Sequence, residues 1–208
     1  MTSARAGSPT FISTPDEWQA VTSAARMELL EALISLGEST AAELGFALDR
    51  APDGLYHHLR ALVAAGLVEQ GERHEPGRRP EATFAVTGDD LRFDVDPATG
   101  KNVEPMVKVG QVQLRRAARY FADAMRSGDA EGDGPNRNLR LWVDLVWLND
   151  AERERANELF GELHDLFESS RKRRHGTLHA CTFAMSPVVR TRGTDERTAK
   201  RLSRRSTR

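Results

Sequence analysis

Apolar residues recur at three- and four-residue spacing in several stretches of the chain, which is the pattern of helices that bury one face. The first stretch begins at the sequence TPDE, in which Thr14 can cap a helix and Glu17 can return the hydrogen bond of a capping box. The apolar positions that follow at this spacing are Trp18, Val21, Ala25, Leu29, Leu33 and Leu36. The pattern predicts a single helix that ends at Gly37.

Two further helices are predicted between residues 40 and 65. The apolar face of the first, over residues 40–48, consists of Ala41, Leu44 and Leu48. The buried stripe of the second, over residues 53–65, consists of Leu55, Leu59 and Leu62. Either Pro52 lies in the first turn of this second helix or Asp53 caps it, and Gly66 ends it.

Short strands are predicted on both sides of a basic loop that follows these helices. Residues 67–70 and 83–87 have the composition of strands, and Pro76, Gly77 and Pro80 mark a turn-rich loop between them. Three helices, a strand, a basic loop and a second strand form the order of a winged helix-turn-helix domain. The fold predicted for the whole chain is mainly α with small β elements.

Three motifs in this region resemble the DNA-binding module of ArsR-type bacterial transcription regulators. They are R-x-x-L-L-x-x-L at residues 26–33, a Thr-initiated helix with Glu and Leu at residues 40–48, and L-x-x-H-L-x-x-L-x-x-A-G-L-V at residues 55–68. The resemblance covers roughly residues 16–90. It implies a DNA-binding regulator that pairs through a long helix. The chain departs from the family where the recognition helix opens with APDG, and where SAAR replaces a proline so that the first two helices fuse.

Polar residues on the predicted recognition helix are the main candidates for DNA contact. With the leucines buried, Tyr56, His57 and Arg60 are expected to point outward, toward a major groove, where His and Arg can bind base edges or phosphate. Asp53 would cap the helix or accept from a cytosine amino group. His58, nearer the leucines, is expected to be partly buried and hydrogen-bonded. The alternative for the outward residues is a merely solvated face.

Basic residues of the loop between the strands can reach phosphate or the minor groove. Acidic residues at positions 72, 75 and 81 dilute their charge. The full set of candidate DNA-binding residues is Thr40, Asp53, Tyr56, His57, Arg60, Arg73, His74, Arg78 and Arg79.

A long helix is predicted over residues 104–126, with small and apolar residues in the alternating pattern of two helices packed lengthwise. These residues are Val107, Gly110, Leu114, Ala117, Phe121 and Ala124. A core helix within one chain gives the same pattern. The family resemblance favours a homodimer interface through the first five of these residues.

A small α/β unit is expected after a flexible linker at residues 127–136. Alternating apolar residues predict strands over residues 139–148, where a short helix is the alternative, and over residues 177–188. A helix over residues 151–171 lies between them, with an Asn cap and with Leu159, Leu163, Leu166 and Phe167 turned inward. The unit would support the dimer or sense an effector.

The domain boundaries that these patterns predict are as follows: residues 1–13 as a flexible N-terminus, 14–90 as the winged helix-turn-helix, 91–127 as a connection and dimerisation helix, 128–189 as the small α/β unit, and 190–208 as a disordered basic tail.

Composition adds limits on the class of protein. The chain has 208 residues, 39% of them apolar, with a net charge of −1, so its overall charge does not indicate a nucleic-acid partner. The tail from residue 190 nevertheless holds eight Lys and Arg against two acids, and it either contacts phosphate or is simply solvated. The chain lacks an apolar run of membrane-spanning length and a signal-peptide stretch. Its single cysteine fits a reducing cytoplasm.

Searches for catalytic and metal-binding patterns favour neither activity. Residues 38–65 contain no cysteine, and His175, His179 and Cys181, with His164 more distant, fall short of a convergent ligand set. Cys181 is expected to be a small buried residue. No nucleophile elbow, phosphate-binding glycine loop or zinc-protease motif occurs, so we expect no cofactor, no metal and no enzyme.

The prediction that follows is a cytoplasmic homodimer that binds double-stranded DNA, with an inverted repeat as its site, and regulates transcription. One alternative is a winged-helix module for protein–protein contact. Another is a regulator whose small-molecule effector binds the C-terminal unit.

Overall fold

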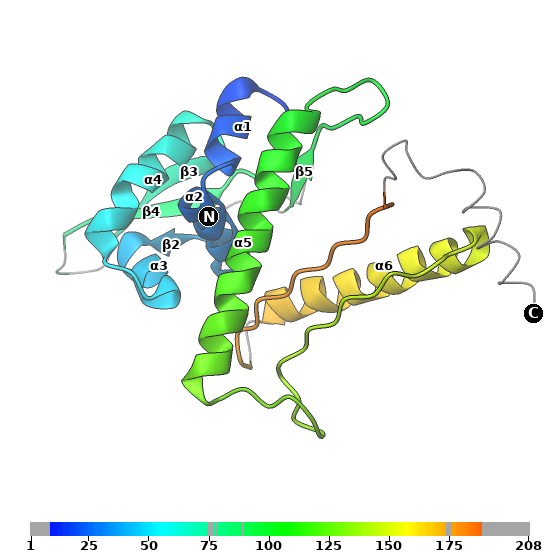
Figure 1. Cartoon of the computed structure of the whole chain (residues 1–208). Helices are drawn as coiled ribbons and strands as arrows, with labels where there is room; N and C mark the ends of the chain where they lie inside the picture. The colour runs from blue at the N-terminus through cyan, green and yellow to red at the C-terminus, as the bar shows by residue number, and fades with distance from the viewer. Residues whose placement is uncertain (1–8, 75–76, 78, 89, 174–175, 189–208) are drawn as a thin grey trace, which may run out of the picture.

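The computed structural model describes residues 9–74, 77, 79–88, 90–173 and 176–188. They form a mainly helical chain with a few short strands, in which an N-terminal winged helix-turn-helix is followed by a long helix (Figure 1). The elements in chain order are β1 (Thr10–Ile12), α1 (Pro15–Val21), α2 (Ala24–Leu36), β2 (Ser39–Thr40), α3 (Ala41–Leu48), α4 (Pro52–Ala64), β3 (Val68–Arg73), β4 (Glu81–Val86), β5 (Leu91–Phe93), α5 (Val103–Ser127) and α6 (Asp150–Arg173). The predicted fold class is confirmed for the winged helix-turn-helix and for the long helix.

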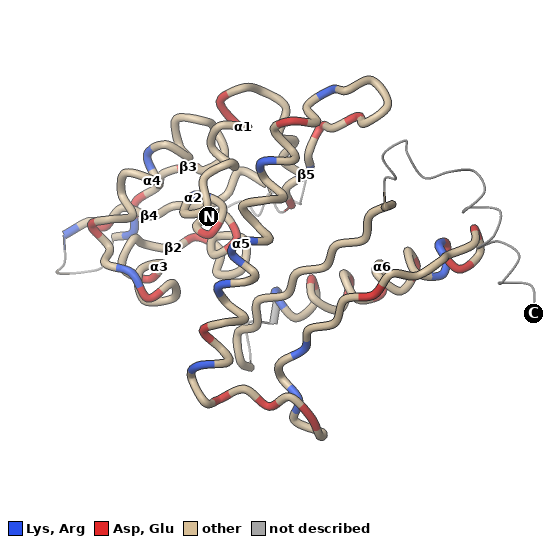
Figure 2. The backbone as a smooth tube through the Cα atoms, in the orientation of Figure 1, with Lys and Arg blue, Asp and Glu red and all other residues tan. Residues whose placement is uncertain are grey.

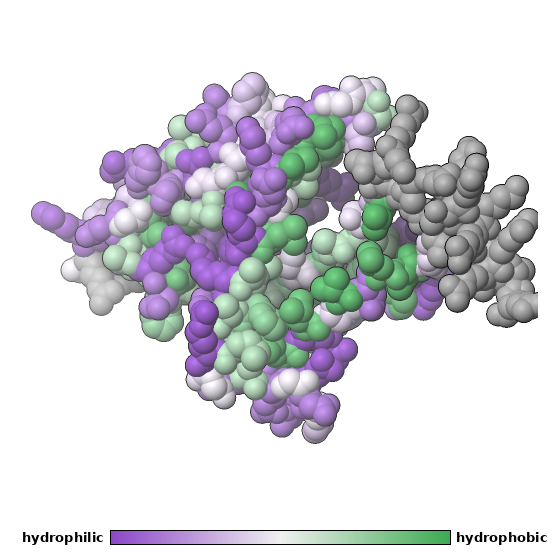
Figure 3. Space-filling model, viewed as in Figure 1, coloured by the Kyte–Doolittle hydropathy of each residue, from purple (hydrophilic) through white to green (hydrophobic). Residues whose placement is uncertain are grey.

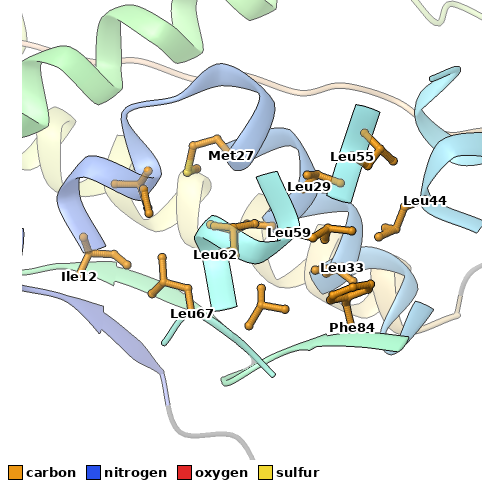
Figure 4. Close-up of a cluster of buried hydrophobic side chains, with 14 of the residues drawn as sticks. Ile12, Met27, Leu29, Leu33, Leu44, Leu55, Leu59, Leu62, Leu67 and Phe84 are labelled. Carbon is orange, nitrogen blue, oxygen red and sulfur yellow. The ribbon is translucent and has the colours of Figure 1, made fainter. Parts of the chain in front are cut away.

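The hydrophobic core lies between α2, α4 and the small sheet. Its fully buried members include Leu29 and Leu33 of α2, Leu59 and Leu62 of α4, and Phe84 of β4 (Figure 4). Burying one such side chain contributes about 1.5–3 kcal/mol. The leucine stripe that the sequence predicts for the third helix is therefore the surface that fixes α4 on the domain.

Two small sheets complete the domain. Strands β2, β4 and β3 form an antiparallel sheet in which Val68 pairs with Val86 and Arg73 with Glu81. Strands β1 and β5 pair in parallel, with Ile12 opposite Phe93. Ile12 is fully buried, so residues 10–12 belong to the fold and not to the flexible N-terminus that the sequence predicted. The short apolar strand was missed because its partner lies about eighty residues away.

The single N-terminal helix predicted up to Gly37 is wrong, because the structure divides it into α1 and α2. Thr22 ends α1, and Ser23 has an extended backbone at φ −93° and ψ 125°. The Arg26 side chain donates to the Ala20 carbonyl at 2.8 Å and to the Gln19 carbonyl. Since Arg26 occupies carbonyls that a continuing helix would use, the helix ends there.

Helix α5, predicted over residues 104–126, is confirmed at nearly these bounds. It packs on α2 and, among its described residues, buries only Val109 (Figure 1). Gly128 ends it with a left-handed backbone at φ 85°. None of the described helices is long and apolar enough to cross a membrane.

The two strands predicted in the C-terminal part are wrong. Residues 139–148 and 177–188 have no strand assignment, and the part of the chain described there holds α6 without a sheet. Alternating apolar residues suit an extended backbone, but a strand also needs a neighbouring strand for its hydrogen bonds. The expected small α/β unit is therefore one helix with extended segments.

Helix α6 begins where the sequence predicted. Asn149 and Glu152 exchange hydrogen bonds of 2.9 and 2.8 Å between side chain and backbone, as in a capping box. Its apolar face is only partly turned inward: Leu163 and Phe167 are half-buried, but Leu159 is 49% and Leu166 54% exposed. Phe183 of the second extended segment covers part of this face, stacked on Phe167 with a 6.0 Å centroid distance.

Candidate nucleic-acid interface

The turn between α3 and α4 sets the direction of the candidate recognition helix. Asp49 ends α3 with a left-handed backbone at φ 51°, and the Arg50 N–H donates to the Gly45 carbonyl at 2.8 Å. A side chain at Gly45 would place its Cβ 2.6 Å from the Arg50 carbonyl oxygen. Only glycine permits this close approach, so Gly45 is a requirement of the turn.

Helix α4 begins directly after this turn. Pro52 is its first residue, where the fixed φ of proline suits a helix start and the missing N–H costs nothing. Ala51 precedes it without a side-chain cap, so of the two alternatives for this helix start the structure has Pro52 in the first turn and not a cap by Asp53. Asp53 lies in the exposed first turn, where a carboxylate interacts favourably with the helix dipole.

The exposed face of α4 carries three of the predicted DNA-binding residues. Asp53, His57 and Arg60 are exposed, opposite the buried leucines. Arg60 forms no ion pair with any residue that the structure describes. This face therefore presents an imidazole and a guanidinium, which are donors suited to base edges and phosphate.

Tyr56 does not point outward as the sequence analysis expected. It is half-buried, and its ring meets Phe84 of β4 edge-on with the centroids 6.3 Å apart. The ring helps to hold α4 against the sheet.

His58 is half-buried, as expected, but the hydrogen bond expected for it is absent at one ring nitrogen. Its Nδ1 is buried and has no hydrogen-bond partner within the described chain. Burial, followed by the charges of His57, Arg26 and Arg50, lowers the pKa of His58 below its ordinary value. The neutral imidazole is therefore favoured in the folded domain.

Thr40 is buried, and its hydroxyl serves the start of α3. The Thr40 oxygen accepts from the Glu43 N–H at 3.2 Å, while the Thr40 N–H donates to the Glu43 carboxylate at 2.7 Å. This capping box occupies the side chain that the sequence analysis proposed for DNA contact. Thr40 therefore positions α3, and its hydroxyl is not presented at the surface.

Arg73, at the end of β3, also makes an internal contact. Its guanidinium lies 2.7 Å from the Glu43 carboxylate of α3. This hydrogen bond, followed by that of the Thr40 N–H, lowers the pKa of Glu43. Arg73 thus connects the wing to the helix-turn-helix, and much of its charge is offset there.

The loop between β3 and β4 is the wing. His74 and Arg79 are exposed, with His74 lying 3.4 Å from the Glu72 carboxylate. Arg78 lies outside the described residues. Figure 2 shows basic and acidic residues interleaved over the helix-turn-helix and the wing, so any phosphate contact there depends on placement.

Two features of this surface escaped the sequence analysis. Phe46 is 93% exposed, and it lies on α3, the helix that precedes α4 in the helix-turn-helix. Its position off the Ala41, Leu44 and Leu48 face was a signal that could have found it. Arg50 binds the buried Glu28 of α2, a contact between residues 22 apart that no local pattern announces.

Residues proposed for pairing lie along one side of α5. Val107 is 45% and Leu114 54% exposed, and Gly110, Ala117 and Phe121 are half-buried. Figure 3 shows hydrophobic residues gathered over the C-terminal half of α5 and the segments that follow it. This side of α5 is therefore partly exposed in the described chain, at Val107 and Leu114 above all.

The described residues include no group of three or more His, Cys, Asp or Glu that could hold a metal ion. Cys181 is exposed, which corrects the expectation of a buried residue in a strand. An apolar hollow lies between α6 and the second extended segment, lined by Phe160, Leu163, His164, Phe167, Phe183, Ala184 and Met185.

Comparison with known proteins identifies a helix-turn-helix domain in residues 21–71, which match the family model of that description. The match supports the prediction of a DNA-binding transcription regulator. A solved structure titled "Structure of Disulfide formed AbfR" is similar at 14% identity and a TM-score of 0.30, covering 50% of this chain and 67% of that chain. This likeness is too distant to carry an argument. No curated protein matches the chain.

Proposed function

We propose that this protein is a regulator of transcription that binds specific sequences of double-stranded DNA as a homodimer. The observation that carries the proposal is the exposed face of α4, which follows a helix-turn-helix turn and lies beside a wing. A helix in this setting enters the major groove, and the wing reaches the flanking backbone. The match of residues 21–71 and the resemblance of residues 16–90 to ArsR-type regulators support it.

The roles of the individual side chains follow from their placement. His57 and Arg60 would bind base edges or phosphate from α4, and Arg79 with Arg78 would bind phosphate from the wing. Asp53 would accept from a cytosine amino group, since it does not cap the helix. Thr40 and Arg73 would act indirectly, by holding α3 and the wing in place.

Homodimer formation is proposed through the exposed apolar side of α5. Val107, Leu114 and Phe121 recur every seven residues, with Gly110 and Ala117 between them, and such a seam lets two helices pack lengthwise. A two-fold axis along α5 would place two copies of α4 about 34 Å apart, one turn of DNA, so the site would be an inverted repeat. A cytoplasmic location remains a prediction from the sequence.

Selection of bound duplexes from a random DNA pool at physiological salt tests this function. Wild-type protein should enrich one motif with two-fold symmetry. A protein carrying His57→Ala and Arg60→Ala should enrich none, whereas an Arg92→Ala control, changed on β5, should enrich the same motif as wild type. Failure of the wild-type protein to enrich any motif would leave the protein–protein module as the better reading.

A further inference from the structure

Glu28 of α2 occupies an unusual position for a charged residue. Among the described residues it is the one charged residue that is buried, with its side chain 6% exposed. Burying a carboxylate is costly unless it is paired and hydrogen-bonded. Its partners therefore indicate what the chain uses it for.

Three donors from two different parts of the chain converge on this carboxylate. One oxygen, Oε2, accepts from the guanidinium of Arg50 in the α3–α4 turn. The other, Oε1, accepts from Arg119 at 2.9 Å and from the Tyr120 hydroxyl at 2.6 Å, both on α5. Burial, followed by the hydrogen bond to Glu28, raises the pKa of Tyr120, so the hydroxyl stays protonated and donates.

Arg50 lies two residues before the first residue of α4. The Arg50 backbone is held on α3 in two ways. The Arg50 N–H donates to the Gly45 carbonyl at 2.8 Å, and the Arg50 carbonyl oxygen packs closely against Gly45. Its side chain is held on α2 through Glu28. The start of α4 therefore has a fixed connection to Glu28, and a displacement of Glu28 would reach Pro52 through a short, packed path.

Two different faces of helix α5 carry the contacts to Glu28 and the residues of the proposed dimer seam. Val109, Gln113, Arg116 and Tyr120 face the chain's own winged helix-turn-helix. The seam residues follow them directly in sequence, as Leu114 follows Gln113 and Phe121 follows Tyr120. One residue is about 100° of rotation around the helix, so the seam lies on a neighbouring face. One rigid helix thus connects the seam with Glu28.

We propose that Glu28 is a positioning residue that couples the placement of α5 to the direction of the recognition helix α4. Tyr120 and Arg119 connect Glu28 to α5, and Arg50 connects Glu28 to the start of α4. The inference rests on the proposed function and deepens it, since it assigns residues outside the DNA-facing surface to control of specific binding. A change in the dimer, or in the C-terminal part beyond α5, would alter operator affinity through this carboxylate.

The chain contains a matched control for this contact. Glu31, one turn along α2, accepts from Gln113 at 3.0 Å and from Arg116, both on α5. It is the same kind of α2–α5 contact, but none of the described hydrogen bonds or ion pairs joins Glu31 to the α3–α4 turn. Tyr120→Phe removes one donor from Glu28, and Gln113→Met removes one from Glu31.

Hydrogen exchange provides the first test and needs no DNA. Tyr120→Phe should speed exchange of the amides at the α3–α4 turn and the start of α4, such as Gly54, whose N–H donates to Ala51 at 3.2 Å, by about fivefold or more. Exchange in α1 should be unchanged, and Gln113→Met should leave the turn unchanged. Equal exchange at the turn in wild type and Tyr120→Phe would overturn the coupling, whatever the protein binds.

DNA affinity provides the second test, on the duplex selected by the wild-type protein. Tyr120→Phe should weaken this duplex by about fivefold or more, and a random duplex much less, without changing the oligomeric state. In an Arg50→Gln background, Tyr120→Phe should have little further effect, because the path is already broken. Additive losses would overturn the coupling. A wild-type protein without a preferred duplex would instead count against the proposed function, and the exchange result would stand alone.

Discussion

Arg60 is the side chain whose replacement tests most directly whether α4 reads DNA. It is exposed and forms no ion pair with the described residues, so its guanidinium is available to guanine or phosphate. Arg60→Ala should lower specific affinity by about 1–3 kcal/mol and relax sequence preference if it reads a base. Replacing Arg78 and Arg79 together should weaken all sequences more evenly. Titration with the selected duplex and with a scrambled duplex measures the specific affinity and the sequence preference. Unchanged binding by Arg60→Ala would show that this face does not enter the groove.

Glycine substitutions separate a packing requirement from simple helix propensity. Gly45→Ala would place a methyl group 2.6 Å from the Arg50 carbonyl oxygen, a backbone atom that cannot move aside, and should destabilise the domain by about 1–3 kcal/mol. Gly54→Ala meets nothing within 4 Å and should stabilise α4 by about 0.5–1 kcal/mol. Urea unfolding distinguishes them. Equal stability of the two variants would contradict the close α3–α4 approach.

His58 predicts a stability change in mild acid. Its folded pKa is lowered from the ordinary value of 6.5, so the unfolded chain takes up a proton first as the pH falls. Its contribution to stability is complete above pH 6.5 and is lost as the pH decreases from there toward the folded pKa. His58→Leu should reduce the difference in unfolding free energy between pH 7 and pH 5. The same difference in both proteins would mean that His58 is readily protonated in the folded domain.

At the scale of elements, α5 packs on the winged helix-turn-helix and also carries the proposed dimer seam. Leu114→Asp or Phe121→Asp would place a charge in the seam and should convert the proposed dimer to monomer, because a carboxylate buried between two helices has no partner there. Arg115→Asp, one position along and exposed, is the control and should remain dimeric. Light scattering reports the mass. A dimer that persists in both seam variants would show that α5 is not the pairing element.

The wing and the helix-turn-helix also act as one unit, because Arg73 of β3 binds Glu43 of α3. The same carboxylate closes the capping box with Thr40. Two residues that the sequence analysis proposed for DNA contact thus fix the relative positions of elements that would carry the contacts.

At the scale of the whole molecule, much apolar surface is uncovered in the described chain. Exposed large side chains include Leu114 on α5 and, in the extended segments, Trp142, Val143, Trp147 and Leu178, the last four at 69%, 86%, 80% and 80%. Large exposed apolar patches mark surfaces that contact another molecule. This supports assembly of the chain through α5 and the C-terminal part.

Residues 190–208 lie outside the described residues, but their composition gives a prediction for DNA binding. Each phosphate that they neutralise would add about −0.9 to the slope of log K against log salt. Removing residues 190–208, which hold eight Lys and Arg, should flatten the slope by about 2–4 and weaken specific and random DNA alike. Salt titration of both proteins on one duplex measures the slope. Identical slopes would leave phosphate binding to α4 and the wing.

The sequence by itself determined those local features of this protein that depend on neighbouring residues. Thr14 with Glu17 and Asn149 with Glu152 cap helices where the sequence predicted, and the spacing of Leu55, Leu59 and Leu62 predicted the buried face of α4. These features depend on residues within four positions of one another, so they can be read from the order of the chain.

Only the tertiary structure decided what distant residues do together. The convergence of Arg50, Arg119 and Tyr120 on Glu28 joins residues between 22 and 92 positions apart. The pairing of β1 with β5 is equally distant in sequence, and the alternating residues at 139–148 form no strand in the described chain. Periodicity specifies a backbone geometry, but which residues meet across the fold depends on how the elements pack. That packing places Thr40 and Arg73 in internal contacts.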